Sequence, residues 1–311
     1  DASVGVYIHI PFCERVCPYC DFAVVAAPEL PANQEDRSVD ALLRELASRR
    51  AAYREPNAAS QDPDAAASRN PSAAASRDPN GLGSRLASIY LGGGTPALLT
   101  PASLARIVDA IRTAFPRDGP VEITLEVNPS TLERARLPEF RALGVNRVSG
   151  GSQSYAGELL KRRGRAHRVE DVRRTLAACR AAGCREISLD LIFAAPGQSL
   201  AGVEADLARA LEFGPDHVST YELTIESGTP FALAASRGQL SLPDEGEAIA
   251  MLETLDDRLR AGGFVRYEIS NYARPGFQAV HNRRYWERQP VLGLGVGAFS
   301  TEPPSAAAPF G

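Results

Sequence analysis

The chain has 311 residues, 44% of them hydrophobic and 23% charged, with a formal net charge of −4. This length suits a single α/β barrel, and the apolar fraction is enough for a sizeable core. Charges of both signs are interspersed, which argues against a nucleic-acid binder. No apolar run approaches the ~20 residues needed to cross a bilayer, which argues against a membrane-spanning protein.

The first predicted strand, Val4–Ile10, leads directly into a loop with three cysteines, Cys13, Cys17 and Cys20. Three residues separate the first pair and two the second. This spacing lets three thiolates bind one metal ion or one small metal cluster. A four-iron cluster usually takes four cysteines, and three would leave one iron open to another ligand. The spacing therefore indicates a metal-binding loop that keeps an open position.

Two other interpretations of this loop stay open. Zinc could be held by the three cysteines together with His9, although His9 would have to turn back from its strand. A disulfide framework needs further pairs, and only Cys179 and Cys184 remain, far along the chain. Clustered, reduced cysteines and the lack of a leader segment predict a cytoplasmic protein.

Strands and helices then alternate along the chain. Thr100 is expected to cap a helix that has Pro101 at its first position. Alternation repeated about six times predicts a parallel sheet with helical crossovers, and this length favours a partial barrel. The other expected helices are Gln34–Tyr53, Thr131–Leu143, Val169–Ala182, Leu200–Phe213 and Asp244–Ala261, and the other expected strands are Ser88–Leu91, Glu122–Asn128, Arg147–Gly151, Glu186–Phe193 and His217–Thr224.

Residues 54–85 have a different composition from the rest of the chain. They are mostly Ala, Ser, Asn, Asp, Arg and Pro, with two near-repeats, and no large apolar side chain occurs between Tyr53 and Leu82. Such a segment cannot bury enough surface to offset the entropy of ordering. We therefore expect a disordered low-complexity insert at the surface.

Polar and glycine residues follow successive predicted strands, at the edge where parallel sheets place their chemistry. The run Gly92–Pro96 follows the second strand, Glu126 closes the third, Gln153 follows the fourth and Asp190 lies in the fifth. The glycines allow a ligand to approach the backbone, but the lysine of a phosphate-binding P-loop is missing. The two carboxylates fit an acid/base pair, contacts to a polar cofactor, or ordinary strand ends.

The cysteine loop, with Tyr19 before Cys20, resembles the cluster loop of radical S-adenosylmethionine proteins. In that family three cysteines hold a 4Fe-4S cluster, and the methionyl amine and carboxylate of S-adenosylmethionine occupy the fourth iron. Tyr267–Ala273 and His281–Trp286 resemble the HemW branch, the haem chaperones. The other runs similar to the surrounding oxygen-independent coproporphyrinogen III oxidase group are His9–Cys13, Gly92–Pro96, Glu126–Pro129, Gly144–Ser149, Gln153–Tyr155 and Asp190–Ile192.

The resemblance implies a fold and a division of the chain. Residues 1–240 would form the radical SAM core, a partial (β/α)6-type TIM barrel that carries the insert. Residues 241–311 would begin a truncated C-terminal extension, the HemW-like region, because relatives continue further.

The resemblance also implies roles for individual residues around the cluster held by the three cysteines. Tyr7 and Tyr19 would lie beside the cofactor, Gly94 and Thr95 would hold the methionyl end of S-adenosylmethionine, and Glu126 would bind the same molecule. Gln153, Arg165 and Asp190 match positions that hold a second S-adenosylmethionine in the oxidase branch.

One departure helps to distinguish the two branches. The oxidases carry a fourth cysteine two positions after the triad, and this chain has Phe22 there. The expected function is therefore a haem chaperone that delivers haem to acceptor proteins, with an electron donor as a further partner. The alternative is an oxygen-independent coproporphyrinogen III oxidase. A second departure is Ala194-Ala195, where the family usually has Gly-Leu.

The segment His281–Trp286 is suited to a porphyrin. The His281 imidazole can ligate haem iron, Arg283 and Arg284 can pair with propionates, and Tyr285 or Trp286 can stack on the ring. The alternative is that His281 and Trp286 only tether a loop and fill the core. His167 and His217 are expected at the surface or at strand edges.

Overall fold

The computed structural model describes residues 3–54, 85–117, 119–129, 131–164 and 167–301. Most of the predicted insert lies outside the described residues. The helices are α1 (Ala32–Arg54), α2 (Pro101–Ala114), α3 (Thr131–Ala142), α4 (Gly157–Arg162), α5 (Val169–Ala181), α6 (Leu200–Glu212), α7 (Pro230–Ser236), α8 (Glu245–Ala261) and α9 (Val280–Trp286), with a short 3-10 helix at Pro96–Leu98. The strands are β1 (Ser3–Ile10), β2 (Phe12–Cys13), β3 (Val25–Ala26), β4 (Arg85–Gly93), β5 (Glu122–Val127), β6 (Arg147–Gln153), β7 (Glu186–Phe193), β8 (His217–Glu222), β9 (Val265–Arg266), β10 (Asn271–Ala273) and β11 (Val291–Leu294).

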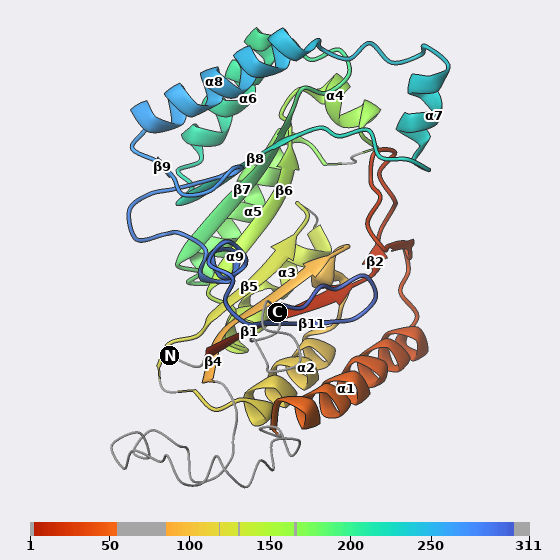
Figure 1. Cartoon of the computed structure of the whole chain (residues 1–311), viewed down its shortest axis with the longest axis vertical. Coiled ribbons are helices and arrows are strands. Elements are labelled where there is room, and N and C mark those ends of the chain that lie inside the picture. The colour runs from red at the N-terminus through yellow and green to blue at the C-terminus, as the bar shows by residue number, and fades with distance from the viewer. Residues whose placement is uncertain (1–2, 55–84, 118, 130, 165–166, 302–311) are drawn as a thin grey trace, which may run out of the picture.

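One curved sheet organises the described part of the chain, in the order β11-β1-β4-β5-β6-β7-β8-β10-β9. The six strands from β1 to β8 in this order are parallel neighbours, which confirms the predicted α/β barrel core. Figure 1 shows α1 and α2 beside one end of the sheet and α6 and α8 beside the other. The carboxyl ends of the parallel strands therefore meet along one edge.

Strands near the C-terminus add to both edges of this sheet, and the sequence did not predict them. β11 pairs in parallel with β1, with Gly5 opposite Val291, and β10 runs antiparallel to β8, with Asn271 opposite Ser219. Both strands are short, so their alternation of apolar residues gives little signal. The region after residue 240 thus contributes directly to the sheet of the predicted core.

The cap predicted at Thr100 is confirmed. The Thr100 hydroxyl accepts a hydrogen bond from the Ser103 amide at 3.2 Å, with Pro101 opening α2. Asp244 and Glu247 form a reciprocal capping box at the start of α8. None of the described helices combines the length and apolar character needed to span a bilayer.

Ala194, directly after β7, has a left-handed backbone with φ of 55°. A side chain is strained in this region by roughly 1–2 kcal/mol, whereas glycine is not. Ala194→Gly is therefore expected to raise the free energy of unfolding by about 1 kcal/mol, measured by urea denaturation. Buried Ala195, whose φ is ordinary, is the control, and Ala195→Gly should lower it by a similar amount. Equal destabilisation by both changes would contradict the strain.

Candidate functional site

The cysteine loop is closed at its base by a pair of two-residue strands. β2 and β3 pair in parallel, and the Ala27 amide donates to the Cys13 carbonyl at 2.7 Å. Inside the loop, the Cys20 amide donates to the Cys17 carbonyl at 3.1 Å. These bonds fix where the loop leaves β1 and where it returns.

Buried His9 tethers this loop to the barrel. Its Nε2 lies 3.1 Å from the Ala23 carbonyl, and its Nδ1 lies 3.2 Å from the Tyr7 hydroxyl. Desolvation lowers the pKa of His9, which suits a neutral ring that accepts from Tyr7 and donates to Ala23. Because both ring nitrogens are engaged, His9 does not serve as a fourth zinc ligand in this structure.

The three loop thiols are half-buried and line one cavity of about 650 Å³. All five cysteines are among the described residues, and none is in a disulfide. In the described chain no three His, Cys, Asp or Glu side chains converge on a single metal ion. A cubane does not require such convergence, because each cysteine binds a different iron atom at a different corner.

Two glycines of the Gly92–Gly94 turn, Gly93 and Gly94, are required by close contacts with their surroundings. A Cβ on Gly94 would lie 2.6 Å from the Phe12 carbonyl oxygen and 3.0 Å from Cys13 Sγ. Gly93 has φ of 104°, and a Cβ there would meet the His9 ring at 2.7 Å. The turn thus passes directly against the base of the cysteine loop, and no larger residue fits without movement.

Hydrogen bonds join this turn to the loop and to β5. The Gly94 amide donates to the Ile10 carbonyl at 2.8 Å, and the Thr95 amide donates to the Phe12 carbonyl at 2.7 Å. The Thr95 hydroxyl lies 3.9 Å from Cys13 Sγ and accepts from Asn128 Nδ2 at 2.7 Å. Thr95 thus links the first cysteine to the carboxyl end of β5.

Glu126 faces the same cavity from β5. Its carboxylate accepts from the Tyr90 hydroxyl at 2.8 Å and from the Gly93 amide at 3.2 Å. Burial raises the pKa of Glu126 to about 7, the nearby Asp190 adds to this effect, and the two donors oppose it. A cationic group placed here would favour the carboxylate, so Glu126 is suited to hold an ammonium or a polarised hydroxyl.

This pKa predicts a pH-dependent stability. The folded-state pKa of about 7 lies above the ordinary 4.5, so the folded protein binds more protons and loses stability as the pH rises between these values. From pH 5 to pH 8 the loss from Glu126 should be about 2–3 kcal/mol. Glu126→Gln removes this titrating group. The difference in unfolding free energy between wild type and variant should therefore change by about 2–3 kcal/mol between pH 5 and pH 8. Parallel pH profiles in urea denaturation would contradict the shift.

Asp190 and Gln153 line the same cavity from β7 and from the end of β6. The Ser149 hydroxyl donates to the two Asp190 carboxylate oxygens at 3.2 and 3.1 Å. Gln153 ends β6 with a left-handed φ of 63°, a strained conformation that surrounding contacts must hold.

Arg163, which the sequence did not single out, supplies such a contact. Its guanidinium is almost completely buried and donates to the Gln153 carbonyl at 2.6 Å and to the Ile192 carbonyl at 3.2 Å. It therefore ties the carboxyl ends of β6 and β7 together behind the cavity. Nothing in the surrounding run of basic residues distinguishes it from a solvated arginine.

The other expected cofactor contacts are distributed as follows. Tyr19 lines the cluster cavity, and its ring lies 6.1 Å from that of Phe231. Tyr7 lines a neighbouring cavity, with its ring 5.9 Å from that of Tyr90. Arg165 lies outside the described residues. The structure thus gathers Gly94, Thr95, Glu126, Gln153 and Asp190 around the three cysteines.

The expected haem-binding segment forms α9, which the sequence did not predict as a helix. His281 is only 2% exposed, and its Nδ1 lies 2.9 Å from the Ser88 hydroxyl. Burial, with a smaller effect of Arg284, lowers the pKa of His281 to about 3. Trp286 is 53% exposed and Tyr285 37%. The aromatic side chains of α9 are therefore accessible, whereas its histidine is enclosed.

The two arginines of α9 have different environments. Exposed Arg283 pairs with Glu287 on the same helix. Buried Arg284 donates to the carbonyls of Ser3 and Pro290, so it anchors α9 to β1 and the segment before β11. The suggested pairing of Arg284 with a propionate is therefore wrong for this structure.

The expectation that His217 lies at the surface or at a strand edge also needs correction. His217 is buried, with Nδ1 2.8 Å from the Ser188 hydroxyl and Nε2 2.9 Å from the Tyr267 hydroxyl. His167 lies in the wall of the cluster cavity, with Nε2 3.2 Å from the Ser152 carbonyl. Their sequence neighbours gave no sign of these tertiary positions.

A parallel partial barrel whose first loop presents three cysteines to a cavity at its carboxyl edge defines a radical SAM protein. The model of the radical SAM superfamily matches residues 82–210. The chain is 36% identical over 296 residues to the haem chaperone HemW of Escherichia coli K12, covering 95% of this chain and 69% of the relative. It is 34% identical over 295 residues to HemW of Bacillus subtilis 168, covering 94% and 70%. The chain belongs to the HemW family of radical SAM proteins.

The solved structure of coproporphyrinogen III oxidase, HemN, from Escherichia coli has the same fold. It superposes with a TM-score of 0.74 at 24% identity, covering 97% of this chain and 65% of that one. This likeness confirms the architecture. The HemW relatives are 36% and 34% identical to this chain, whereas HemN is 24% identical.

Proposed function

We propose that this chain is a haem chaperone that binds a 4Fe-4S cluster and S-adenosylmethionine and passes haem to acceptor proteins. Cys13, Cys17 and Cys20 would hold the cluster in the loop that β2 and β3 close. When bound, the cluster supplies one-electron chemistry at its open iron. The observation that carries the proposal is the single cavity shared by the three thiols, the glycine turn and Glu126.

The protein's own groups around this cavity fit S-adenosylmethionine. The backbone at Gly94 and the Thr95 hydroxyl would meet the methionyl end, because they lie beside Cys13. Glu126 would accept from the cofactor's amine or ribose, and a bound cation would keep it ionised. Gln153 and Asp190, which line the same cavity, would contact either the same molecule or a second one.

Haem would dock on the exposed side of α9. Trp286 and Tyr285 offer apolar rings for the macrocycle, and Arg283 can exchange its surface pairing with Glu287 for a propionate, since such pairs contribute little stability. Iron ligation by His281, suggested by the sequence, would require α9 to move away from Ser88. Phe22, at the rim of the cluster cavity, occupies the position of the oxidases' additional cysteine.

Haem titration of the anaerobically reconstituted chain, followed by transfer to an apo-haemoprotein, tests this function. We expect one haem per chain, transfer to the acceptor, and binding weakened about tenfold by Trp286→Ala. Leu233→Ala, an exposed apolar change on α7, is the control and should bind haem normally. Lack of haem binding, or formation of protoporphyrinogen from coproporphyrinogen, would contradict the chaperone function. An unchanged haem spectrum in His281→Ala would exclude His281 as the iron ligand.

A further inference from the structure

A second cavity, of about 210 Å³, adjoins the cluster cavity inside the barrel and shares Tyr90, Glu126, Ser149 and Tyr221 with it. Thr124, Arg147, Ser188 and His217 line it from the amino-terminal halves of β5, β6, β7 and β8. Helix α9 contributes His281 to the same wall. Residues at the amino ends of barrel strands usually pack together and stabilise the fold. An unfilled polar space among them is therefore a candidate binding site.

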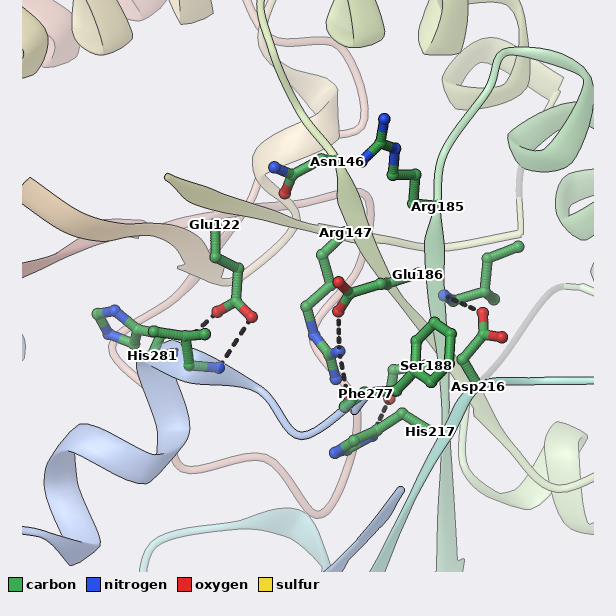
Figure 2. Close-up of polar contacts among 12 residues, drawn as sticks. Glu122, Asn146, Arg147, Arg185, Glu186, Ser188, Asp216, His217, Phe277 and His281 are labelled. Carbon is green, nitrogen blue, oxygen red and sulfur yellow. Dashed lines mark hydrogen bonds and ion pairs between the residues drawn. The ribbon is translucent and has the colours of Figure 1, made fainter. Parts of the chain in front are cut away.

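Hydrogen bonds fix α9 against this end of the barrel. Glu122 accepts from the backbone amides of Val280 and His281 at 2.8 and 2.9 Å, and Arg147 donates to the Phe277 carbonyl at 3.3 Å (Figure 2). The cavity is therefore closed on this side by α9, which hydrogen bonds from β5 and β6 hold in place.

Three buried polar atoms that line this cavity find no hydrogen-bond partner among the described residues. They are Thr124 Oγ1, Asn271 Oδ1 and His281 Nε2, and their side chains are 0%, 7% and 2% exposed. A buried polar group without a partner is costly, so such groups normally meet water or a ligand. Asn271 Oδ1 can only accept, whereas the other two can donate or accept.

The ionisable side chains that line the cavity are either paired with an opposite charge or favoured in their neutral form by burial. Arg147 pairs with Glu186 at 3.0 Å, and burial lowers the pKa of His217 and His281, which keeps both rings neutral. Glu126, at the boundary with the cluster cavity, has its pKa raised to about 7. A net charge on an occupant would be removed from water without a free counter-charge, which disfavours ions.

Aromatic rings set the shape of the space. The rings of Tyr90 and His281 lie 5.2 Å apart, those of Tyr7 and Tyr90 5.9 Å apart, and Tyr285 meets His281 edge-on at 5.5 Å. An engineered cavity of about 150 Å³ in another protein binds benzene, so about 210 Å³ takes one or two fused rings and excludes a porphyrin. Tyr221 and Tyr285, 43% and 37% exposed, line the cavity on its accessible side.

We propose that this cavity binds one small, flat, uncharged nitrogen heterocycle, of nucleobase size, at a site that adjoins the cluster cavity and is distinct from the cysteine loop. Stacking against the tyrosines would hold its faces, and its edge would donate to Asn271 and bond to Thr124 and His281. This ligand class combines ring shape with edge donors and acceptors, which are the two features of the wall. The site does not depend on the proposed haem transfer.

Calorimetric titration of the cluster-loaded chain with cytosine, hypoxanthine and nicotinamide tests the proposal. Saturating S-adenosylmethionine is present, so that the cluster cavity is filled. At least one probe should bind once per chain, and Thr124→Val, which removes one unpaired hydroxyl but keeps the shape, should weaken binding about tenfold. Thr175→Val, at a buried threonine in α5 outside the cavity, is the matched control and should bind as wild type does.

A thermal melt of each variant separates binding from folding. Because the Thr124 hydroxyl has no partner, Thr124→Val should melt no lower than the wild type, whereas Thr175→Val loses its bond to the Asp171 carbonyl and should melt lower. Crystals soaked in the bound probe should show it against Asn271 and His281. The proposal is overturned if no probe binds, if Thr124→Val binds equally well, or if only water occupies the soaked cavity.

Discussion

Replacing Cys17 with serine is expected to remove at least nine-tenths of the iron taken up by this chain after anaerobic reconstitution. A hydroxyl at this position stays protonated near neutral pH and is a hard ligand, whereas iron in such clusters is held by thiolates. With two thiolates left, the loop would lose both the cluster and the open iron. Iron, sulfide and visible absorbance per chain measure the effect.

Cys179→Ser is the matched control for this prediction. Cys179 is a buried core residue in α5 and does not line the cluster cavity. Its replacement can lower stability but should leave the iron content per folded chain unchanged. Equal iron in the Cys17 variant and the wild type would show that the three cysteines do not hold the cluster.

Gly94→Ala should have the second large effect. The added Cβ would lie 2.6 and 2.9 Å from the carbonyl oxygens of Phe12 and Ile10 and 3.0 Å from Cys13 Sγ, so backbone must move. Overpacking of this kind costs roughly 1–3 kcal/mol and would displace the first cysteine. We expect S-adenosylmethionine binding to weaken at least a hundredfold, measured by equilibrium dialysis, with unfolding followed in urea.

Gly157→Ala controls for the loss of glycine itself. A Cβ on Gly157 would meet nothing within 4 Å, and the residue opens α4 at an ordinary φ. Alanine is the better helix former, so stability should hold or rise slightly. If Gly94→Ala bound S-adenosylmethionine as well as Gly157→Ala does, the close approach of the turn to the cysteine loop would not matter for binding.

The six parallel strands could be predicted because strand-like runs alternate with helices along the chain, although the apolar signal is strong in β7 and weak in β6, where Val148 is the only large apolar side chain. The short elements could not. α4, α7 and α9 have six or seven residues, and β10 and β11 three or four. Elements of this size are too short to show a periodic pattern, and β10 and β11 form by pairing with β8 and β1, far away in the chain.

The functional residues divide in the same way. Cys13, Gly94 and Glu126 were identifiable because their residue types and strand-end positions carry chemical meaning. His9 and Arg163 hold the site through bonds to carbonyls of Ala23, Gln153 and Ile192. Such bonds depend on the tertiary structure, and no local sequence pattern predicts them.

The structure supports a tethering role for some residues of the His281 segment and a porphyrin contact for others. His281 is enclosed and Arg284 anchors the helix, as a tethering role requires, whereas Trp286 is exposed, as contact with a porphyrin requires. The sequence listed suitable side chains but not which face of a seven-residue helix each would occupy. That depends on Glu122 and Ser88, more than 150 residues earlier.

The most direct measurement is electron paramagnetic resonance of the anaerobically reconstituted, reduced chain, with and without S-adenosylmethionine, beside an assay of iron and sulfide. We predict about four irons and four sulfides per chain, with a cluster signal that changes when S-adenosylmethionine is added, because the open iron gains a ligand. A chain that holds zinc without sulfide, or a cluster signal indifferent to S-adenosylmethionine, would contradict a three-cysteine cluster with one open iron.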